Sequence, residues 1–182
     1  MKKADPTKII FYDKLNEKKL KTTKAEFLNK VSDVGRRLGV PMNWLLFAME
    51  LESAGTFDPS ITNSLGYTGL IQFGAVAAKE VGTTTTALRR MDAVTQMEYV
   101  YKYLVKYKSK YKTFVDLYLA IFFPLAIGKP EDWVLEAKGL PSGKVAQWNP
   151  LFDLNKDGKI QVKEIRQKLL NRVPEEFKKY FV

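Results

Sequence analysis

Residues 42–72 read MNWLLFAMELESAGTFDPSITNSLGYTGLIQ, and this stretch decides the fold. Its first eleven residues are apolar on nearly every side, which is typical of a helix buried at the centre of a domain. Glycines, a proline and Asn63 follow and predict a loop or tight hairpin over residues 54–69. The stretch therefore predicts a central helix, from Met42 to about Ser53, that opens onto a glycine-rich loop.

Capping signals and helical spacing of apolar residues predict further helices on both sides of this stretch. Thr23 and Glu26 form a capping-box pattern at the start of a helix that ends at Gly39. The other predicted helices cover 70–81, a short segment from the threonine run 83–86 through Met91, a longer segment capped by Asp92, 114–123, a start at 130–132, and 165–171. No segment alternates like a strand, so the sequence predicts a mainly α fold.

The length of 182 residues suits one domain with a short appendage. Residues 1–22 are rich in lysine, and we expect a weakly ordered lead-in with one short helix. Residues 23–145 form the predicted domain, and residues 146–182 form a separate C-terminal segment. Composition then limits the chemistry. Without Cys or His, thiol catalysis, Ser-His-Asp triads and Cys- or His-ligated metals are excluded. Acid–base work falls to Asp, Glu, Lys or Tyr, and a metal ion would be held by oxygen.

Glu52 is the candidate catalytic acid. It ends the apolar helix, where partial desolvation would favour the protonated form that a general acid needs. Glu50 is the rival, but residues two apart on a helix face different ways, so only one of them can point into a cleft. We assign the acid to Glu52, on the residues that follow it, and expect Glu50 to face solvent.

The residues around Glu52 form a longer pattern: Glu52-Ser53, Phe57-Asp58-Pro59, Asn63, Gly66 and Gly69-Leu70-Ile71-Gln72. This pattern resembles the soluble lytic transglycosylases and goose-type lysozymes. The resemblance implies a lysozyme-like α fold, a catalytic Glu52, and a peptidoglycan glycan strand as substrate. The substrate-binding residues it suggests, together with aromatic neighbours that could stack on sugars, are Ser53, Asn63, Tyr67, Gly69, Gln72 and Phe73.

The chain departs from the family pattern in several places. The loop after Ser53 is two residues longer, and Tyr67 replaces a small residue. The family's Tyr-Asn pair is absent from LYLAIFFPLAIGKP, where Tyr118 and Phe122 are the nearest substitutes. Goose-type lysozymes carry aspartates at positions that align with Asn63 and Gly74, and neither residue is acidic here.

Hydrolysis usually needs two carboxylates, whereas the resemblance to lytic transglycosylases implies that one acid can suffice. The sequence therefore favours the transglycosylase reaction at the MurNAc-GlcNAc β-1,4 bond. Two alternatives stay open: a muramidase that hydrolyses the same bond, and a non-catalytic glycan-binding virion protein.

Residues 153–164, DLNKDGKIQVKE, fit the EF-hand calcium loop at each diagnostic position. The predicted Ca²⁺ ligands are Asp153, Asn155, Asp157, the Lys159 carbonyl, Gln161 and Glu164. Gly and two Pro residues precede the loop, so a full entering helix is not expected. The sequence holds no second loop to pair with it, which predicts a structural calcium site that clamps the C-terminal segment.

The formal net charge is 30 − 20 = +10, with a lysine-rich run at 102–112, and favours an anionic partner. We expect peptidoglycan and, in a virion, other virion proteins, but no nucleic acid and no membrane span. The start MKKADPTKII lacks the apolar region of a signal peptide. We therefore expect delivery to the bacterial cell wall by phage lysis (as an endolysin), by a virion, or by a dedicated secretion system.

Overall fold

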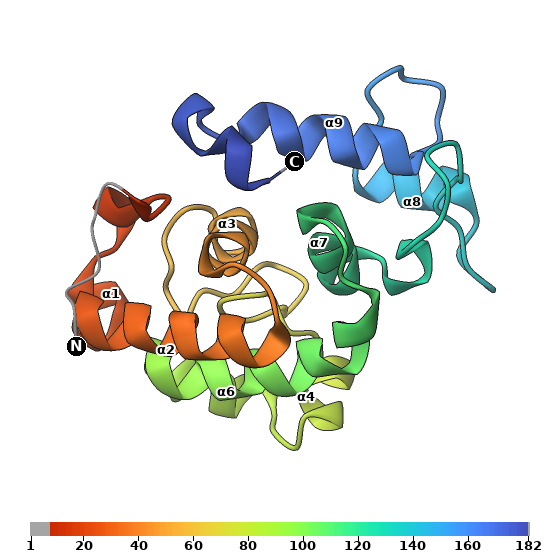
Figure 1. Cartoon of the computed structure of the whole chain (residues 1–182). Coiled ribbons are helices and arrows are strands. Elements are labelled where there is room, and N and C mark those ends of the chain that lie inside the picture. The colour runs from red at the N-terminus through yellow and green to blue at the C-terminus, as the bar shows by residue number, and fades with distance from the viewer. Residues whose placement is uncertain (1–7, 182) are drawn as a thin grey trace. The chain divides into compact units, whose positions relative to one another are not determined.

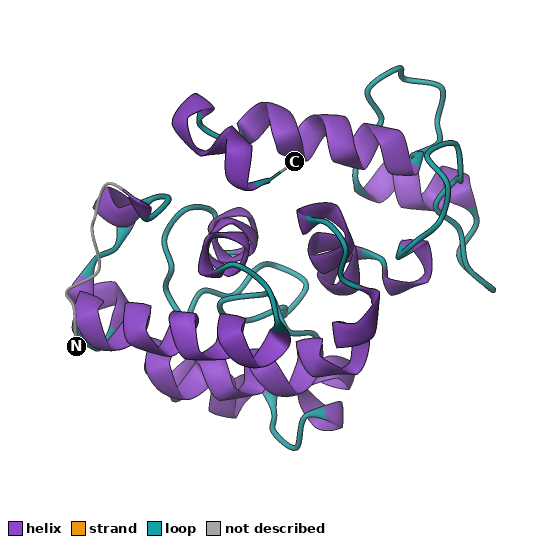
Figure 2. Cartoon of the chain, in the orientation of Figure 1, coloured by secondary structure: helices purple, strands orange, loops and turns teal. Residues whose placement is uncertain are grey.

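The computed structural model describes residues 8–181, and its regular secondary structure is helical, which confirms a mainly α fold. Figure 2 shows helices joined by loops, and only isolated β-bridges occur in the described part. The chain divides into two compact units, Met1–Lys108 and Ser109–Val182. This division differs from the boundary at 145/146 expected from the sequence, because residues 109–145 belong with the C-terminal elements. None of the helices in residues 8–181 has the length and apolarity that crossing a membrane requires.

The first unit contains six α-helices among its described residues. They are α1 (Glu17–Leu20), α2 (Lys24–Leu38), α3 (Met42–Glu52), α4 (Ala75–Glu80), α5 (Thr85–Arg90) and α6 (Ala93–Leu104). The 3₁₀ turn η2 (Tyr12–Lys14) precedes α1, and the 3₁₀ turn η3 (Val105–Lys110) follows α6 and runs across the boundary between the units.

Local capping explains where α2 and its neighbours begin. Thr23 and Glu26 form the predicted capping box of α2, and Gly39 ends that helix in the left-handed conformation with φ +77°. Thr84 caps α5 by accepting from the Ala87 N–H, and Asp92 caps α6 by accepting from the Thr95 N–H. These boundaries were predicted from sequence because the capping residue and its partner lie three positions apart.

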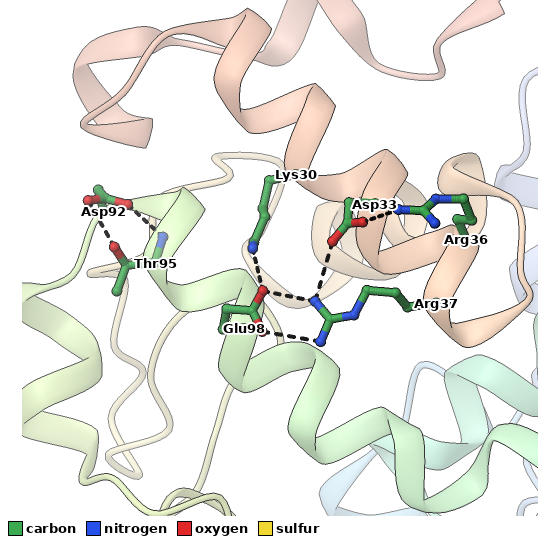
Figure 3. A network of polar contacts seen from close by, with 7 residues as sticks. All are labelled: Lys30, Asp33, Arg36, Arg37, Asp92, Thr95 and Glu98. Atoms are coloured by element: carbon green, nitrogen blue, oxygen red, sulfur yellow. Dashed lines mark hydrogen bonds and ion pairs between the residues drawn. The ribbon is translucent and has the colours of Figure 1, made fainter.

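Helices α2 and α6 lie side by side, and α2 also packs on α3 (Figure 1). A charged network joins α2 to α6: Lys30 and Arg37 both contact Glu98, and Arg37 Nη1 lies 2.9 Å from Glu98 Oε1 (Figure 3). The hydrogen bond from Arg37, followed by that from Lys30, lowers the pKa of Glu98. The apolar faces of both helices are buried, so the network lies at the rim of a packed interface.

Helix α3 is the buried helix that the sequence predicts. Seven of its eleven residues are buried, including Leu46, Phe47 and Met49. The buried residues of α3 continue as far as Glu50, so the packing of the first unit holds the helix almost to its C-terminal end at Glu52.

The segment before α2 is more ordered than expected, because residues 8–20 pack onto α3. Ile10 is fully buried, and its N–H donates to Asn43 Oδ1 on α3 at 3.2 Å. The Asn43 side chain in turn donates to the Lys8 carbonyl at 3.0 Å. The prediction of a weakly ordered lead-in was therefore wrong for the described part, and its first seven residues lie outside the described range.

The second unit contains α7 (Phe114–Phe122), η4 (Pro124–Ala126), α8 (Ser142–Trp148), α9 (Val162–Arg172) and η5 (Glu175–Tyr180). Thr113 and Asp116 form a capping box at the start of α7, and this helix packs against α9. Tyr118 is 4% exposed, and its ring stacks on Phe122 at 5.8 Å between centroids. Both rings also contact Phe152, so Tyr118 and Phe122 belong to an aromatic cluster.

Two predicted helical segments have a different structure. Residues 70–74 form a turn and a bridge, and only Ala75–Glu80 is helical, because Thr68 pairs with Phe73. The helix start at 130–132 was wrong, since Val134 pairs with Gln161 in a β-bridge. A short entering helix, α8, does form before the calcium-type loop, but it ends at Trp148, four residues short of that loop.

Candidate functional site

Glu52 is the last residue of α3 and is half-buried. Directly after it, Ser53 is fully buried and its Oγ accepts from the Phe57 N–H at 2.9 Å. Ala54 and Phe57 adopt positive φ values of 51° and 52°, which non-glycine residues adopt only in tight local turns. The Ser53 hydroxyl therefore holds the sharp turn that follows the candidate acid, and a buried side chain of this kind supports the loop and offers no surface to a glycan.

Glu50 does not face solvent, so that prediction was wrong. Its side chain is buried, and Lys14 Nζ lies 2.6 Å from Glu50 Oε1. Lys14 is brought there by the N-terminal segment, whose packing on α3 the sequence pattern did not reveal. The two acids of α3 therefore have separate surroundings, and Glu50 is engaged in an ion pair that ties residues 8–20 to the end of this helix.

The loop from Ile61 to Phe73 is a compact double turn. Thr62 pairs with Thr68, and Thr68 pairs with Phe73. Asn63 is exposed, and its Oδ1 accepts from the N–H groups of Leu65 and Tyr67 at 2.9 and 3.1 Å. The carbonyl end of the Asn63 side chain thus shapes the turn in the manner of an Asx motif.

The Tyr67 ring lies over Gly74. Tyr67 stands where the family pattern has a small residue, and Gly74 stands where goose-type lysozymes have an aspartate. A Cβ atom added at Gly74 would lie 2.9 Å from Tyr67 Cε1, so a side chain there would require the Tyr67 ring to shift. The Tyr67 ring is 44% exposed. The aromatic ring therefore occupies the space beside the position where the resemblance would place an aspartate, and it offers a partly open face at the end of the loop.

Gly69 and Gln72 complete the loop. Gln72 has φ 51°, is half-buried, and its Nε2 donates to the Gly69 carbonyl at 3.1 Å. Gly69 has φ +88°, and a Cβ atom there would lie 2.3 Å from Gln96 Oε1. Only glycine fits both the backbone conformation and this close approach.

Gln96 is the central residue of this site that sequence reasoning missed. It is fully buried on α6; its Oε1 accepts from the Leu70 N–H at 2.7 Å, and its Nε2 donates to the carbonyls of Pro59 and Leu88 at 2.9 Å each. One side chain thereby fixes both ends of the loop. The sequence did contain one indication of this role. Residue 96 lies on the apolar face of α6, three positions after Ala93 and four before Val100, and a polar side chain buried there needs hydrogen-bond partners.

Phe73 does not offer a ring to a sugar, because it is 2% exposed. It packs edge-on against Tyr103 of α6, with ring centroids 6.0 Å apart. Burial, followed by the neighbouring Tyr107 and Glu80, raises the pKa of Tyr103. Phe73 thus joins the loop to the C-terminal part of α6.

The other carboxylate of the loop, Asp58, has a structural role. Its Oδ1 accepts from the Ser60 N–H at 2.8 Å and from Ser60 Oγ at 2.5 Å. Asp58 therefore closes a local turn through its side chain. Among the carboxylates of residues 50–58, Glu50 is paired with Lys14 and Asp58 is bound to Ser60, so each has a defined partner away from catalysis.

Residues 153–164 of the second unit form a tight loop that is closed by hydrogen bonds from its own backbone. Asp153 accepts from the N–H groups of Asp157 and Gly158 at 3.1 and 3.0 Å, and Asp157 accepts from Lys159 N–H at 2.9 Å. Gly158 adopts φ +80°, as the sharp turn at the sixth position requires. These bonds fix the Asp153 and Asp157 side chains against the backbone of the loop.

Glu164, at the twelfth position, closes the same loop. It is 4% exposed; its Oε1 accepts from the N–H groups of Leu154 and Asn155, and its Oε2 accepts from Gln161 N–H. The Gln161 side chain donates to the Asp132 carbonyl at 3.1 Å. Across residues 8–181, no three His, Cys, Asp or Glu side chains are grouped as a metal site. A cation here would also use the Asn155 amide oxygen and the Lys159 carbonyl.

Residues 133–135 pair through their backbone with the end of this loop. The Leu135 N–H donates to the Ile160 carbonyl at 2.8 Å, and the Val162 N–H donates to the Trp133 carbonyl at 3.1 Å. Ile160, at the eighth position, is fully buried. Residues 133–135 therefore satisfy backbone groups of the loop on either side of the buried Ile160 side chain.

No protein-family model, curated protein or solved structure matches the chain.

Proposed function

We propose that the chain is a lysozyme-like lytic transglycosylase that cleaves the MurNAc-GlcNAc β-1,4 bond of peptidoglycan. The observation that carries this proposal is the setting of Glu52: a half-buried acid at the end of a buried helix, followed by a turn that Ser53 holds and a loop that Gln96 anchors. A fixed, partly desolvated carboxyl group is what a general acid requires.

In this proposal Glu52 performs both proton transfers. Its acid form first protonates the glycosidic oxygen of the leaving sugar. The resulting carboxylate then accepts the proton of the C6 hydroxyl of the muramyl residue as that oxygen attacks the anomeric carbon. The product is a 1,6-anhydro sugar, and no water is consumed.

The engagement of the neighbouring carboxylates favours this single-acid reaction over hydrolysis. Hydrolysing glycosidases use a second carboxylate about 5–10 Å from the first. Glu50 is bound to Lys14, Asp58 is bound to Ser60, and the Tyr67 ring covers Gly74. The sequence positions at which a second acid would be expected therefore carry other interactions.

The same proposal assigns a structural Ca²⁺ ion to residues 153–164. Asp153, Asn155, Asp157, Lys159, Gln161 and Glu164 supply the oxygen donors of the motif. The hydrogen bonds within residues 153–164 and the backbone pairing with residues 133–135 support this assignment. When bound, the ion would neutralise the acidic side chains of the loop and stabilise the second unit.

Replacing Glu52 by Gln tests the catalytic assignment. We expect release of soluble fragments from purified sacculi to fall about 10²- to 10⁴-fold, the usual contribution of a general acid. Glu136→Gln, at an exposed residue of the second unit, makes the same chemical change as a control and should keep full activity. Equal activity of Glu52→Gln and the wild type, both folded by circular dichroism, would remove Glu52 from the mechanism.

A further inference from the structure

The C-terminal part of α6 and the start of η3 carry an unusual alternation of tyrosine and lysine. Tyr99, Tyr103 and Tyr107 recur at steps of four, and Lys102 and Lys106 lie between them. We call these five residues the tyrosine–lysine face. All of them belong to the first unit, so the face does not depend on how the two units are placed.

The lysines of this face lie on the tyrosine rings. Lys102 Nζ lies 4.8 Å from the Tyr99 ring centroid, and Lys106 Nζ lies 4.3 Å from that of Tyr103 and 5.5 Å from that of Tyr107. The three rings are half-buried, whereas both lysines are exposed. The arrangement fixes two ammonium groups at the surface through cation–π contacts and removes part of their rotational freedom.

The charge of this region is strongly one-sided. Residues 99–112 contain five lysines and no acid. Glu80 lies 2.6 Å from Lys106 and compensates one of these charges. A dense row of positive charge on a helix attracts an anionic polymer and gives binding that weakens with salt.

The tyrosine–lysine face contacts the end of the loop 61–73, which carries the candidate binding residues Asn63, Tyr67, Gly69 and Gln72. The Tyr103 ring packs on Phe73, which follows Gln72 at the end of that loop, and on Tyr107 at 6.2 Å between centroids. A polymer bound to the loop 61–73 could therefore also contact the tyrosine–lysine face, and both surfaces belong to the first unit.

We propose that the tyrosine–lysine face is a second binding surface for the cell-wall polymer, and that it takes the carboxylate-bearing peptide stems of peptidoglycan next to the cleaved strand. Lysine ammonium groups suit carboxylates, and phenol groups suit sugar hydroxyls. Nucleic acid fits less well, because base stacking needs open aromatic faces and these rings are half-buried beneath lysines. The proposal rests on the proposed function for the identity of the polymer.

The test measures binding without catalysis. Both substitutions Lys102→Gln and Lys106→Gln are made in a Glu52→Gln background, and the protein is sedimented with purified sacculi freed of secondary polymers. We expect binding to be about tenfold weaker or more than in the Glu52→Gln parent at low salt. Lys18→Gln with Lys19→Gln removes the same charge from exposed positions of α1 and should bind like the parent. Lys102→Arg with Lys106→Arg should retain binding.

Three outcomes would overturn the proposal: unchanged binding of the Lys102/Lys106 variant, an equal loss in the Lys18/Lys19 variant, or tight binding of the parent to duplex DNA with none to sacculi. Sacculi whose carboxylates have been amidated give a further check, and undiminished binding to them would exclude the peptide stems. Failure of the proposed catalysis has a different readout, because it appears as absent fragment release by the Glu52-containing protein and leaves these binding results intact.

Discussion

Gln96 gives the sharpest structural prediction, because one buried side chain fixes both ends of the loop that contains the candidate site. In Gln96→Met the side chain keeps its approximate length and loses its polar atoms. The Leu88 carbonyl retains the hydrogen bond from Met91 N–H, but the Leu70 N–H and the Pro59 carbonyl both lose Gln96. All three residues are buried.

The magnitude follows from the two groups left behind. A buried polar group deprived of its partner costs about 1–3 kcal/mol, so the two groups left by Gln96→Met should lower the free energy of unfolding by about 2–6 kcal/mol. At about 2–4 °C per kcal/mol for a chain of this size, the thermal midpoint should fall by roughly 4–24 °C. Urea unfolding followed by circular dichroism measures the first quantity, and a thermal scan measures the second.

Gln167→Met on α9 is the matched control, because Gln167 is exposed and should change stability by less than about 0.5 kcal/mol. Hydrogen exchange adds a local readout: the amides of residues 61–73 should exchange faster in Gln96→Met than those of α2. A loss below about 0.5 kcal/mol, with unchanged exchange in the loop, would refute the reasoning that Gln96 holds the site together.

Three further predictions follow from neighbouring features. Gly69→Ala should destabilise by about 2 kcal/mol or more in urea, because alanine resists φ +88° and its Cβ meets Gln96; a loss under about 0.5 kcal/mol would contradict this. Glu98→Gln should lower stability at pH 7. Folding lowers the pKa of Glu98, so the stability that its carboxylate contributes is present above the unfolded pKa near ~4.3 and is lost as the pH falls through the folded pKa. A difference in unfolding free energy between the wild type and the variant that stays constant down to pH ~2 would refute this prediction. Ca²⁺ should raise the thermal midpoint relative to a chelator in the wild type and in Glu176→Gln, but not in Glu164→Gln, and equal shifts in all three would exclude the loop.

The helix boundaries that sequence reasoning predicted correctly are those set by neighbouring residues. Thr23, Thr113 and Asp92 each cap a helix through a side chain that bonds three positions ahead. The apolar composition of α3 likewise predicted its burial. Such signals lie within one turn of the chain and need no knowledge of tertiary structure.

The errors arose where a distant segment decides the local structure. Leu70 and Ile71 read as helical because they are apolar, but their burial comes from the double turn closed by Thr68 and Phe73. Glu50 seemed exposed because its partner Lys14 lies 36 positions away. Residues 130–132 resemble a helix start, yet the backbone that follows pairs with residues 160–162. No local pattern contains these partners.

The candidate site divides in the same way. Glu52 and the loop were predicted from a family resemblance, and the calcium-type ligands were predicted from the spacing of the EF-hand motif; these assignments stay predictions. The resemblance did not separate exposed residues such as Asn63 and Tyr67 from the buried Ser53 and Phe73, because burial depends on packing against α6 and other elements. Gln96 lies outside the motif altogether and acts through hydrogen bonds across 26 and 37 positions.

The central claim is that Glu52 alone carries out both proton transfers on peptidoglycan, and the products of a sacculus digest test it most directly. Purified sacculi are digested in Ca²⁺ with the wild type and with Glu52→Gln, and the soluble products are identified by mass spectrometry. The account predicts 1,6-anhydro-muramyl products from the wild type and none from the variant. Muropeptides with reducing muramic acid ends would contradict the single-acid mechanism. Absence of products from a folded wild type that still sediments with sacculi would indicate a glycan-binding protein without catalysis.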